Sequence, residues 1–291
     1  MPVATASRPL MVCADDFGLS DGVDQAIAGL VRAGRLQAFS CLSNAPRWAA
    51  DAHQVAALRQ RAQAGLHFNL TEGRPLSAAL AARWPQLPAL PRLLALAHAG
   101  ALPLDALRDE LAAQWAAFAD AAGAAPDYLD GHQHVHHLPG VRALVLDWLR
   151  SRPLPVRSTG ELRGTGYAVK RWLIERSGGR ALARALRCQG LPHNRVLLGC
   201  YDFQAGDYRS LVRGWLAQVP ADGALLFCHP GRPSSSLQPD DGSEAADPIA
   251  AARQRELAYL AGAEFTQDLA AAGVVLSPAW PVVSTPRRVA A

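Results

Sequence analysis

Short apolar runs alternate with longer amphipathic segments in the first quarter of the chain. The apolar runs span residues 9–14, 36–42 and 64–70, and each has the length of a β-strand. The segments 22–33 and 46–62 between them carry apolar residues at helical spacing. This order of strand, helix, strand, helix, strand favours a parallel sheet with right-handed crossover connections.

The alternation pauses and then resumes in the rest of the chain. Residues 84–103 contain four prolines around a short apolar segment, and we interpret them as an insertion that overhangs the functional site. Residues 104–122 have a clear helical periodicity. Further strands are expected at residues 127–130, 154–158, 195–201, 224–229 and near 274, and further helices at residues 139–150, 168–187, 208–219 and 251–272.

Together these elements predict an α/β fold with seven or eight βα units. The chain has 291 residues and is 50% hydrophobic, so we expect one domain over residues 1–291. Residues 232–250 are rich in Ser, Pro, Asp and Gly without periodicity, which is typical of a mobile loop. Residues 282–291 have the composition of a terminal tail.

The charge and the cysteines narrow the class of protein. The formal net charge is +4, and the basic residues are scattered arginines and the single Lys170, without a dense basic run that would bind nucleic acid. Five cysteines without a CxxC spacing fit a reducing compartment. The sequence has neither a secretory leader nor 18 consecutive apolar residues, so we expect a cytoplasmic protein without a membrane span.

Two adjacent carboxylates end the first apolar run. Asp15 and Asp16 stand directly before Phe17 and Gly18, where the chain is expected to turn. Neighbouring side chains on a straight strand face opposite ways, but at a strand end both can approach one cavity. The pair can therefore supply one metal ligand and one general base. The alternative interpretation is an ordinary Asp pair in a turn or a helix cap.

A histidine interrupts the third apolar run. His67 lies within residues 64–70, and it is either a core histidine or a ligand at the end of a strand. Asn69 follows it closely and is a candidate for substrate binding or for support of the ligands.

Four histidines within six positions give a stronger signal. His132, His134 and His136 would share one face of an extended strand, whereas His132 and His136 would share one face of a helix. Either arrangement lets two imidazoles approach one ion, and His137 is then the bystander. Asp130 could hold an imidazole in one tautomer, and His134 and His136 are candidates for substrate binding or ligand support.

Three further residues could complete a site. His229 follows an apolar run and precedes Pro-Gly, which suits a general acid at a strand end or a buried histidine before a turn. Arg157 could orient an anion or a carboxylate, or lie on the surface. Tyr201 could line a sugar subsite or belong to the core.

Taken in order, these motifs resemble the YdjC family of carbohydrate deacetylases, the ChbG and HpnK-like group. The shared motifs are Asp-Asp-Phe-Gly at residues 15–18, Gly-Leu-His at 65–67, Leu-Thr-Glu-Gly at 70–73, Asp-Gly-His-Gln-His-Val-His at 130–136 and His-Pro-Gly at 229–231. They span nearly the whole chain. The sequence departs from the family pattern at Gly131, where the family usually has Ser.

The resemblance implies a fold, a metal centre and a reaction. The fold would be a distorted TIM-like (β/α) barrel, with one divalent ion on Asp16, His67 and His132. Asp15 would be the general base and His229 an acid or a stabiliser of the intermediate. The reaction would be hydrolytic removal of an acetyl group from an N-acetylated sugar, a chitooligosaccharide-like or related glycan.

The resemblance leaves the identity of the metal ion and the oligomeric state open. The family is associated with Zn²⁺ or Mg²⁺, and a ligand set of one Asp and two His also suits Mn²⁺, Co²⁺ or Ni²⁺. A homodimer is the family-level expectation. A bound ion would lower the pKa of a water molecule to about 7 and polarise the acetyl carbonyl.

Two alternatives remain from the residues alone. Metal-dependent phosphoesterases and amidohydrolases also use histidine pairs on barrels, but with more ligands around two metals. A sugar- or metal-binding barrel without catalytic activity would keep some of the same residues. The candidate base and acid favour an enzyme over such a binding protein.

Overall fold

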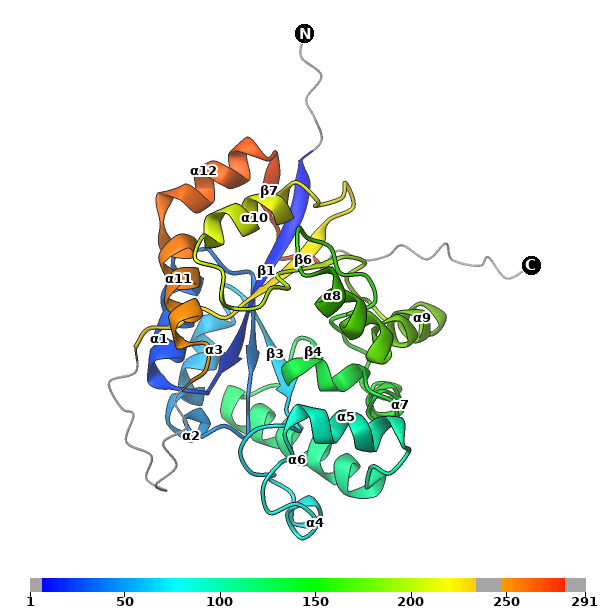
Figure 1. Ribbon diagram of the computed structural model, residues 1–291. Helices are drawn as coiled ribbons and strands as arrows, with labels where there is room; N and C mark the ends of the chain where they lie inside the picture. The colour runs from blue at the N-terminus through cyan, green and yellow to red at the C-terminus, as the bar shows by residue number, and fades with distance from the viewer. Residues whose placement is uncertain (1–6, 234–246, 281–291) are drawn as a thin grey trace, which may run out of the picture.

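The structure, a computed structural model, describes residues 7–233 and 247–280 (Figure 1). The tail expected at residues 282–291 lies outside the described residues, as does most of the loop expected at 232–250. Within the described part, no helix is long and apolar enough to cross a membrane.

The described strands form one parallel sheet around a central first strand. Its order is β4-β3-β2-β1-β6-β5, and β7 also pairs with β1. The strands are β1 (Arg8–Phe17), β2 (Ala38–Cys41), β3 (Gln63–Phe68), β4 (Leu129–Gly131), β5 (Leu197–Leu198), β6 (Ala224–Cys228) and β7 (Val274–Leu276). Leu10 pairs with both Ala224 and Leu276, so β6 and β7 lie on opposite edges of β1. The predicted α/β fold with a parallel sheet is confirmed.

The sheet is an open half-barrel, so the expected distorted TIM-like barrel of seven or eight βα units is not confirmed as a complete barrel. The predicted strand at residues 154–158 is reduced to single bridges from Val156 to Leu129 and to His193. Pro153 and Pro155 both precede Val156. Because proline has no N–H group, it cannot continue a ladder of hydrogen bonds. Between β4 and β5 the described chain therefore continues the sheet only through isolated bridges, not through strands.

Helices cover the sheet from outside and follow much of the predicted pattern. The helix α1 (Asp21–Arg32) begins where the Ser20 hydroxyl accepts the Val23 N–H, and α6 (Leu104–Ala122) ends at Gly123 with φ 70°. The others are α2 (Trp48–Asp51), η1 (Ala52–Gln54), α3 (Val55–Leu58), α4 (Ala78–Ala81), α5 (Leu90–His98), η2 (His132–His137), α7 (Val141–Trp148), α8 (Ala168–Ile174), η3 (Glu175–Gly179), α9 (Arg180–Gln189), α10 (Tyr208–Leu216), α11 (Ala250–Ala261) and α12 (Ala263–Ala271).

Three predicted helices are interrupted. Residues 46–62 divide into α2, η1 and α3, and residues 251–272 divide at Gly262, whose backbone is extended. Residues 168–187 contain the π-helical segment η3, kinked at Gly178, where an added Cβ atom would clash with the His137 carbonyl oxygen. The break between α8 and α9 thus allows a close approach to the histidine cluster, which the helical periodicity could not reveal.

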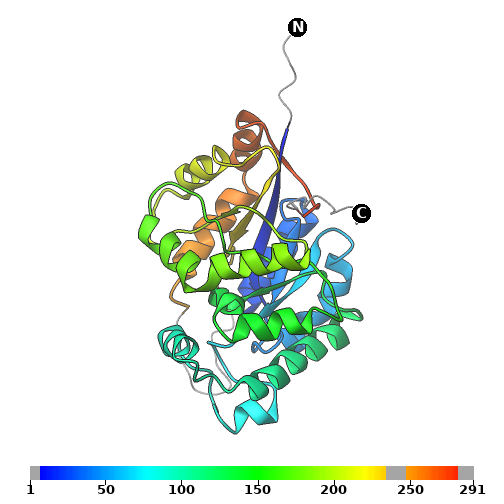
Figure 2. The ribbon, with the colours of Figure 1, turned by 90° about the vertical axis from the view of Figure 1, so that its right-hand side faces the viewer.

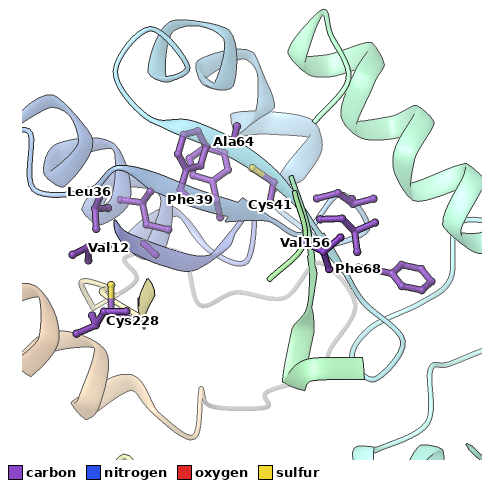
Figure 3. Packing of buried hydrophobic residues seen from close by; sticks show 14 of the residues in the cluster. Val12, Leu36, Phe39, Cys41, Ala64, Phe68, Val156 and Cys228 are labelled. Carbon is purple, nitrogen blue, oxygen red and sulfur yellow. The ribbon is translucent and has the colours of Figure 1, made fainter. Parts of the chain in front are cut away.

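The core lies between the sheet and its helices. Nearly every residue of β1 is buried, as expected for a strand covered on both faces. Figure 3 shows part of this core, in which Val12, Phe39 and Ala64 come from three neighbouring strands. This packing fixes the strand ends at which the polar residues lie.

Candidate active site

The polar residues singled out in the sequence meet at the carboxyl ends of four strands. Asp15 and Asp16 lie at the end of β1, His67 on β3, Asp130 on β4, and His229 directly after β6. In parallel sheets this edge is where side chains from different strands converge on a ligand. The strand ends of the half-barrel therefore form the candidate active site.

A bulge at the end of β1 separates the two carboxylates. The register between β1 and β2 shifts between Ala14 and Phe17, and Asp16 has φ 77°. A bulge bends the strand and redirects its side chains, and a left-handed conformation is uncommon outside glycine. As a result, Asp15 and Asp16 approach the site from different directions.

Asp16, His67 and His132 form a buried cluster of metal-binding type. Their potential ligand atoms lie within 4.8 Å of one another. Asp16 Oδ1 is 3.1 Å from His132 Nδ1 and 3.6 Å from His67 Nε2. One carboxylate and two imidazoles are the donor set of an open catalytic centre. The residues present therefore fit a divalent metal ion.

Asp130 orients His67 within this cluster. His67 Nδ1 donates to Asp130 Oδ1 at 2.6 Å, which leaves the Nε2 lone pair directed toward Asp16. Burial acts to raise the pKa of Asp130, but Arg157 and His67 together lower it below its ordinary value. Asp130 is therefore ionised and fixes the tautomer that a metal ligand requires.

Arg157 binds the second carboxylate of the pair. Its Nη1 and Nη2 atoms donate to Asp15 Oδ2 and Oδ1, both at 2.6 Å, and Nη2 also lies 2.6 Å from Asp130 Oδ2. The Arg157 side chain is completely buried. Bidentate contact fixes the plane of a carboxylate as well as compensating its charge. Arg157 thus links Asp15 to the residue that orients His67.

A second potential metal cluster, Cys13, Asp15 and Asp130, is filled by this guanidinium. Arg157 Nη2 lies 3.0 Å from Cys13 Sγ and 2.6 Å from both carboxylates. Burial raises the pKa of Cys13 to about 12, although Arg157 lowers it. A neutral thiol beside an arginine is a poor metal ligand, so the described residues hold one plausible metal centre here.

Arg253 binds the free oxygen of the metal-ligand candidate Asp16. Its Nη2 atom donates to Asp16 Oδ2 at 2.8 Å, and its Nε donates to Asp247 at 2.7 Å. Burial acts to raise the pKa of Asp16, but Arg253 and His132 hold it well below its usual range. Arg253 could not be predicted from the sequence, because a lone arginine in an amphipathic helix is usually exposed.

His132 lies between two acidic side chains. Its Nδ1 atom faces Asp16, and its Nε2 atom lies 3.2 Å from Glu72 Oε1, which also accepts from Gln133. Burial acts to lower the pKa of His132, but hydrogen bonds to Asp16 and Glu72 raise it to about 10. The two acidic neighbours therefore favour the imidazolium form of His132.

The alternating histidines do not share one face, so that expectation was wrong. Residues 132–137 form the turn η2, with Gln133 and His134 at φ 50° and 63°. His136 Nε2 binds the Arg157 carbonyl oxygen at 2.8 Å, and His137 binds Thr159 and Ser177. His134 packs its ring edge-on against Phe227 at 5.4 Å. Only His132 of the four reaches the metal-binding cluster.

His229 lies in an aromatic environment backed by a buried carboxylate. The centre of its ring lies 5.1 Å from that of Phe203 and 5.6 Å from that of Phe227. Burial lowers the pKa of His229 to about 4, so the imidazole is neutral at pH 7. Its backbone N–H donates to Glu256 Oε2 at 2.6 Å, and its Nδ1 atom is 4.0 Å from Glu256 Oε1. Like Arg253, Glu256 is on α11 and was missed.

Tyr201 and Asn69 support the site instead of facing it. The Tyr201 hydroxyl donates to Glu256 Oε1 at 2.6 Å, and the residue is buried. Asn69 accepts the backbone N–H groups of Thr71 and Glu72 and donates to the Glu72 carbonyl, which holds the turn after β3. Tyr201 therefore does not line an open sugar subsite.

Comparison with known proteins assigns the family. A model of the family described as YdjC-like protein matches residues 9–271. The chain belongs to the YdjC family.

Named relatives within this family are deacetylases. A carbohydrate deacetylase from Homo sapiens is 33% identical over 93% of this chain and 90% of its own length. The carbohydrate deacetylase of Mus musculus is 33% identical over 77% of this chain and 78% of its length. A chitooligosaccharide deacetylase from Proteus mirabilis is 36% identical over 51% of this chain and 58% of its length.

A solved structure from Enterococcus faecalis V583 shares the fold. Its name proposes cellobiose-phosphate cleavage. It aligns with a TM-score of 0.71 and 20% identity, covering 93% of this chain and 97% of its own. At this identity the likeness concerns the fold alone.

Proposed function

We propose that this YdjC-family protein is a metal-dependent deacetylase that removes the acetyl group from an N-acetylated sugar. The observation that carries the proposal is the buried Asp16–His67–His132 cluster beside Asp15, which Arg157 holds at 2.6 Å. The names of the relatives support a carbohydrate substrate. A chitooligosaccharide or a related N-acetylated glycan is the substrate class that we infer.

Asp16, His67 and His132 would hold the ion. When bound, a divalent metal supplies a Lewis acid that activates water and polarises the acetyl carbonyl. The mixed oxygen and nitrogen donors suit Zn²⁺, Mn²⁺, Co²⁺ or Ni²⁺, whereas Mg²⁺ prefers more oxygen ligands. Arg253 would keep Asp16 ionised and leave its Oδ1 atom for the metal.

Asp15 and His229 would move the protons. As water attacks the acetyl carbon, Asp15 would accept one of its protons; a positioned base of this kind contributes roughly 10²–10⁴-fold. The C–N bond then breaks, and the amine takes a proton from His229. Because His229 is neutral at pH 7, it must gain that proton within the catalytic cycle. The inferred source is the proton that Asp15 has taken from the water.

The filled position of Arg157 argues against a two-metal phosphoesterase. Such enzymes need a second ion about 3.5–4 Å from the first. The neighbouring acidic cluster instead holds the Arg157 guanidinium, a permanent cation that compensates the same carboxylates. A non-catalytic binding protein would not need the bidentate contact by which Arg157 fixes the plane of the Asp15 carboxylate.

Acetate release tests this proposal. Metal-free protein would be assayed on N-acetylated mono- and oligosaccharides with and without Zn²⁺, Mn²⁺, Co²⁺, Ni²⁺ or Mg²⁺. We expect metal-dependent release that Asp15→Asn and His132→Ala both abolish. Only His132→Ala should also weaken metal binding by calorimetry. The exposed His53→Ala is the matched control and should retain activity. Two ions per chain with phosphate release, or bound metal without any hydrolysis, would contradict the proposal.

A further inference from the structure

The helix α8 carries an apolar stripe that faces outward. Val169, Trp172 and Leu173 are 72%, 51% and 54% exposed, and no residue of α8 is buried. These positions are spaced i, i+3 and i+4, so they share one face of the helix. They are three of the six large apolar side chains that are exposed in the described part of the chain. An exposed apolar group of this kind indicates an interaction surface.

The surroundings of this stripe are strongly basic. Residues 168–187, from α8 through α9, hold six basic side chains and one acidic one, Glu175. Arg176 continues the stripe by one helical turn, and its guanidinium lies 5.8 Å from the centre of the Trp172 ring. On α9, Arg184 and Arg187 are exposed and lie one helical turn apart. Glu175 forms a salt bridge with Arg180, so it does not pair with the other basic residues of this segment.

We propose that the α8–α9 surface, defined by Val169, Trp172, Leu173 and the basic residues of 168–187, docks the protein on an anionic membrane surface. Exposed Trp and aliphatic side chains beside arginines match the boundary between lipid headgroups and acyl chains. Anionic lipids attract cations that lie near the membrane surface. The attachment is peripheral, because the helix lies on the lipid without crossing it.

A second copy of the chain fits this surface less well. A two-fold dimer would place the same patch against itself. The exposed Arg176, Arg184 and Arg187 would then be brought toward their own copies, while Glu175 on each side is already paired with Arg180. Like charges that are brought together and desolvated oppose association. An anionic partner removes this conflict.

The surface lies next to the candidate active site. Lys170, on α8, donates to the Tyr201 carbonyl at 2.5 Å and stands 4.7 Å from the centre of the Phe203 ring. Phe203 in turn contacts the His229 ring at 5.1 Å. Figures 1 and 2 show α8 and α9 on the outer side of the fold. Docking through α8 would bring the site close to the lipid surface.

Cosedimentation with vesicles tests this surface independently of any deacetylase activity. The full chain would be mixed with sucrose-loaded vesicles of phosphatidylcholine alone or with an equal share of phosphatidylglycerol. We expect pelleting only with the anionic vesicles, weakening as salt rises because the Debye length shortens. The double variant Trp172→Ser/Leu173→Ser should bind more than about tenfold less tightly, since each buried CH₂ contributes about 0.8 kcal/mol.

Matched controls distinguish binding through this surface from nonspecific binding through any exposed apolar residue. Leu76 and Leu104 are also exposed, at 44% and 43%, so Leu76→Ser/Leu104→Ser should bind vesicles like the unchanged protein. Both double variants should keep the thermal midpoint, which shows that they fold. The proposal is overturned if anionic vesicles pellet no protein, or if both double variants lose binding equally. It is also overturned if Trp172→Ser/Leu173→Ser leaves vesicle binding unchanged but alters the oligomeric state, measured as molecular mass by light scattering.

Discussion

At the scale of single residues, one buried cation organises the candidate site. Arg157 binds Asp15 and Asp130, and Asp130 orients His67. The sequence indicated an arginine that could orient a carboxylate, but its partner Asp15 lies 142 positions away. A pattern along the chain cannot reveal such a pairing. For the same reason, Arg253 and Glu256 could not be separated from ordinary charged residues of a surface helix.

The bidentate contact of Arg157 can be tested by a substitution that keeps the charge. Arg157→Lys retains a cation but loses the planar pair of donors. We expect kcat to fall about 10²-fold, because a small displacement of a catalytic group has an effect of that size. The free energy of unfolding should fall by about 2 kcal/mol through the lost charged hydrogen bonds. Arg150→Lys, on an exposed side chain, is the control in the same kinetic and urea-unfolding measurements. Unchanged kcat in Arg157→Lys would refute this role.

The carboxylate behind His229 can be tested by two substitutions at one position. Burial raises the pKa of Glu256 to about 7, so Glu256→Gln resembles its protonated form. We expect this variant to keep the free energy of unfolding within about 1 kcal/mol but to lose about tenfold in kcat. Glu256→Ala should cost about 3 kcal/mol, since it leaves the Tyr201 hydroxyl and the His229 N–H without an acceptor. Equal kcat for Glu256→Gln and the unchanged protein would exclude a role in orienting His229.

At the scale of elements, the sequence predicted the regular segments and missed the places where two segments touch. Residues 104–122 form α6 as expected, because their periodicity is a local property. The helix expected over 168–187 is broken where Gly178 meets His137, and the histidine cluster folds into a turn instead of a strand or a helix. These differences arise from contacts between distant segments, which override local preference.

Gly131 controls the turn that carries His132. A Cβ atom at this position would lie 2.7 Å from His136 Nδ1 and 2.8 Å from the His136 backbone nitrogen. We therefore expect Gly131→Ser, which introduces the usual family residue, to destabilise the protein by about 1–3 kcal/mol. Metal affinity should fall by at least about tenfold, because His132 is displaced. Calorimetry with Zn²⁺ and urea unfolding measure both effects. Gly206→Ser is the control, because no atom lies within 4 Å of its added Cβ, and it should change neither the stability nor the Zn²⁺ affinity. An unchanged Zn²⁺ affinity in Gly131→Ser would show that the turn accommodates the side chain without moving His132.

At the scale of the whole molecule, the order of parallel strands was predictable and the closure of the sheet was not. Strand ends with Asp15, His67 and His229 could be expected to converge, because parallel strands present their carboxyl ends at one edge. The weak wall between β4 and β5 depends on single bridges at Val156 and Leu162. Burying several histidines behind this edge has a consequence for the stability of the entire fold.

Stability should fall as the pH decreases through the range in which these histidines would become charged. Burial lowers the pKa of His136 to about 4 from an ordinary value of 6.5, and it lowers the pKa of His134 and His137 as well. The unfolded chain therefore binds protons before the folded one does. The contribution of His136 is complete above pH 6.5 and is lost between pH 6.5 and 4, amounting to roughly 3 kcal/mol.

A matched comparison isolates this effect from the other titrating groups. In His136→Gln, the amide can still donate to the Arg157 carbonyl but cannot take up a proton. Urea unfolding at pH 7, 5.5 and 4 should show that the stability difference between the unchanged protein and this variant shrinks by roughly 3 kcal/mol toward acid pH. His53→Gln, on an exposed histidine, should give a constant difference. If the free energy of unfolding falls equally with pH in the unchanged protein and in His136→Gln, the protonation of His136 does not oppose folding.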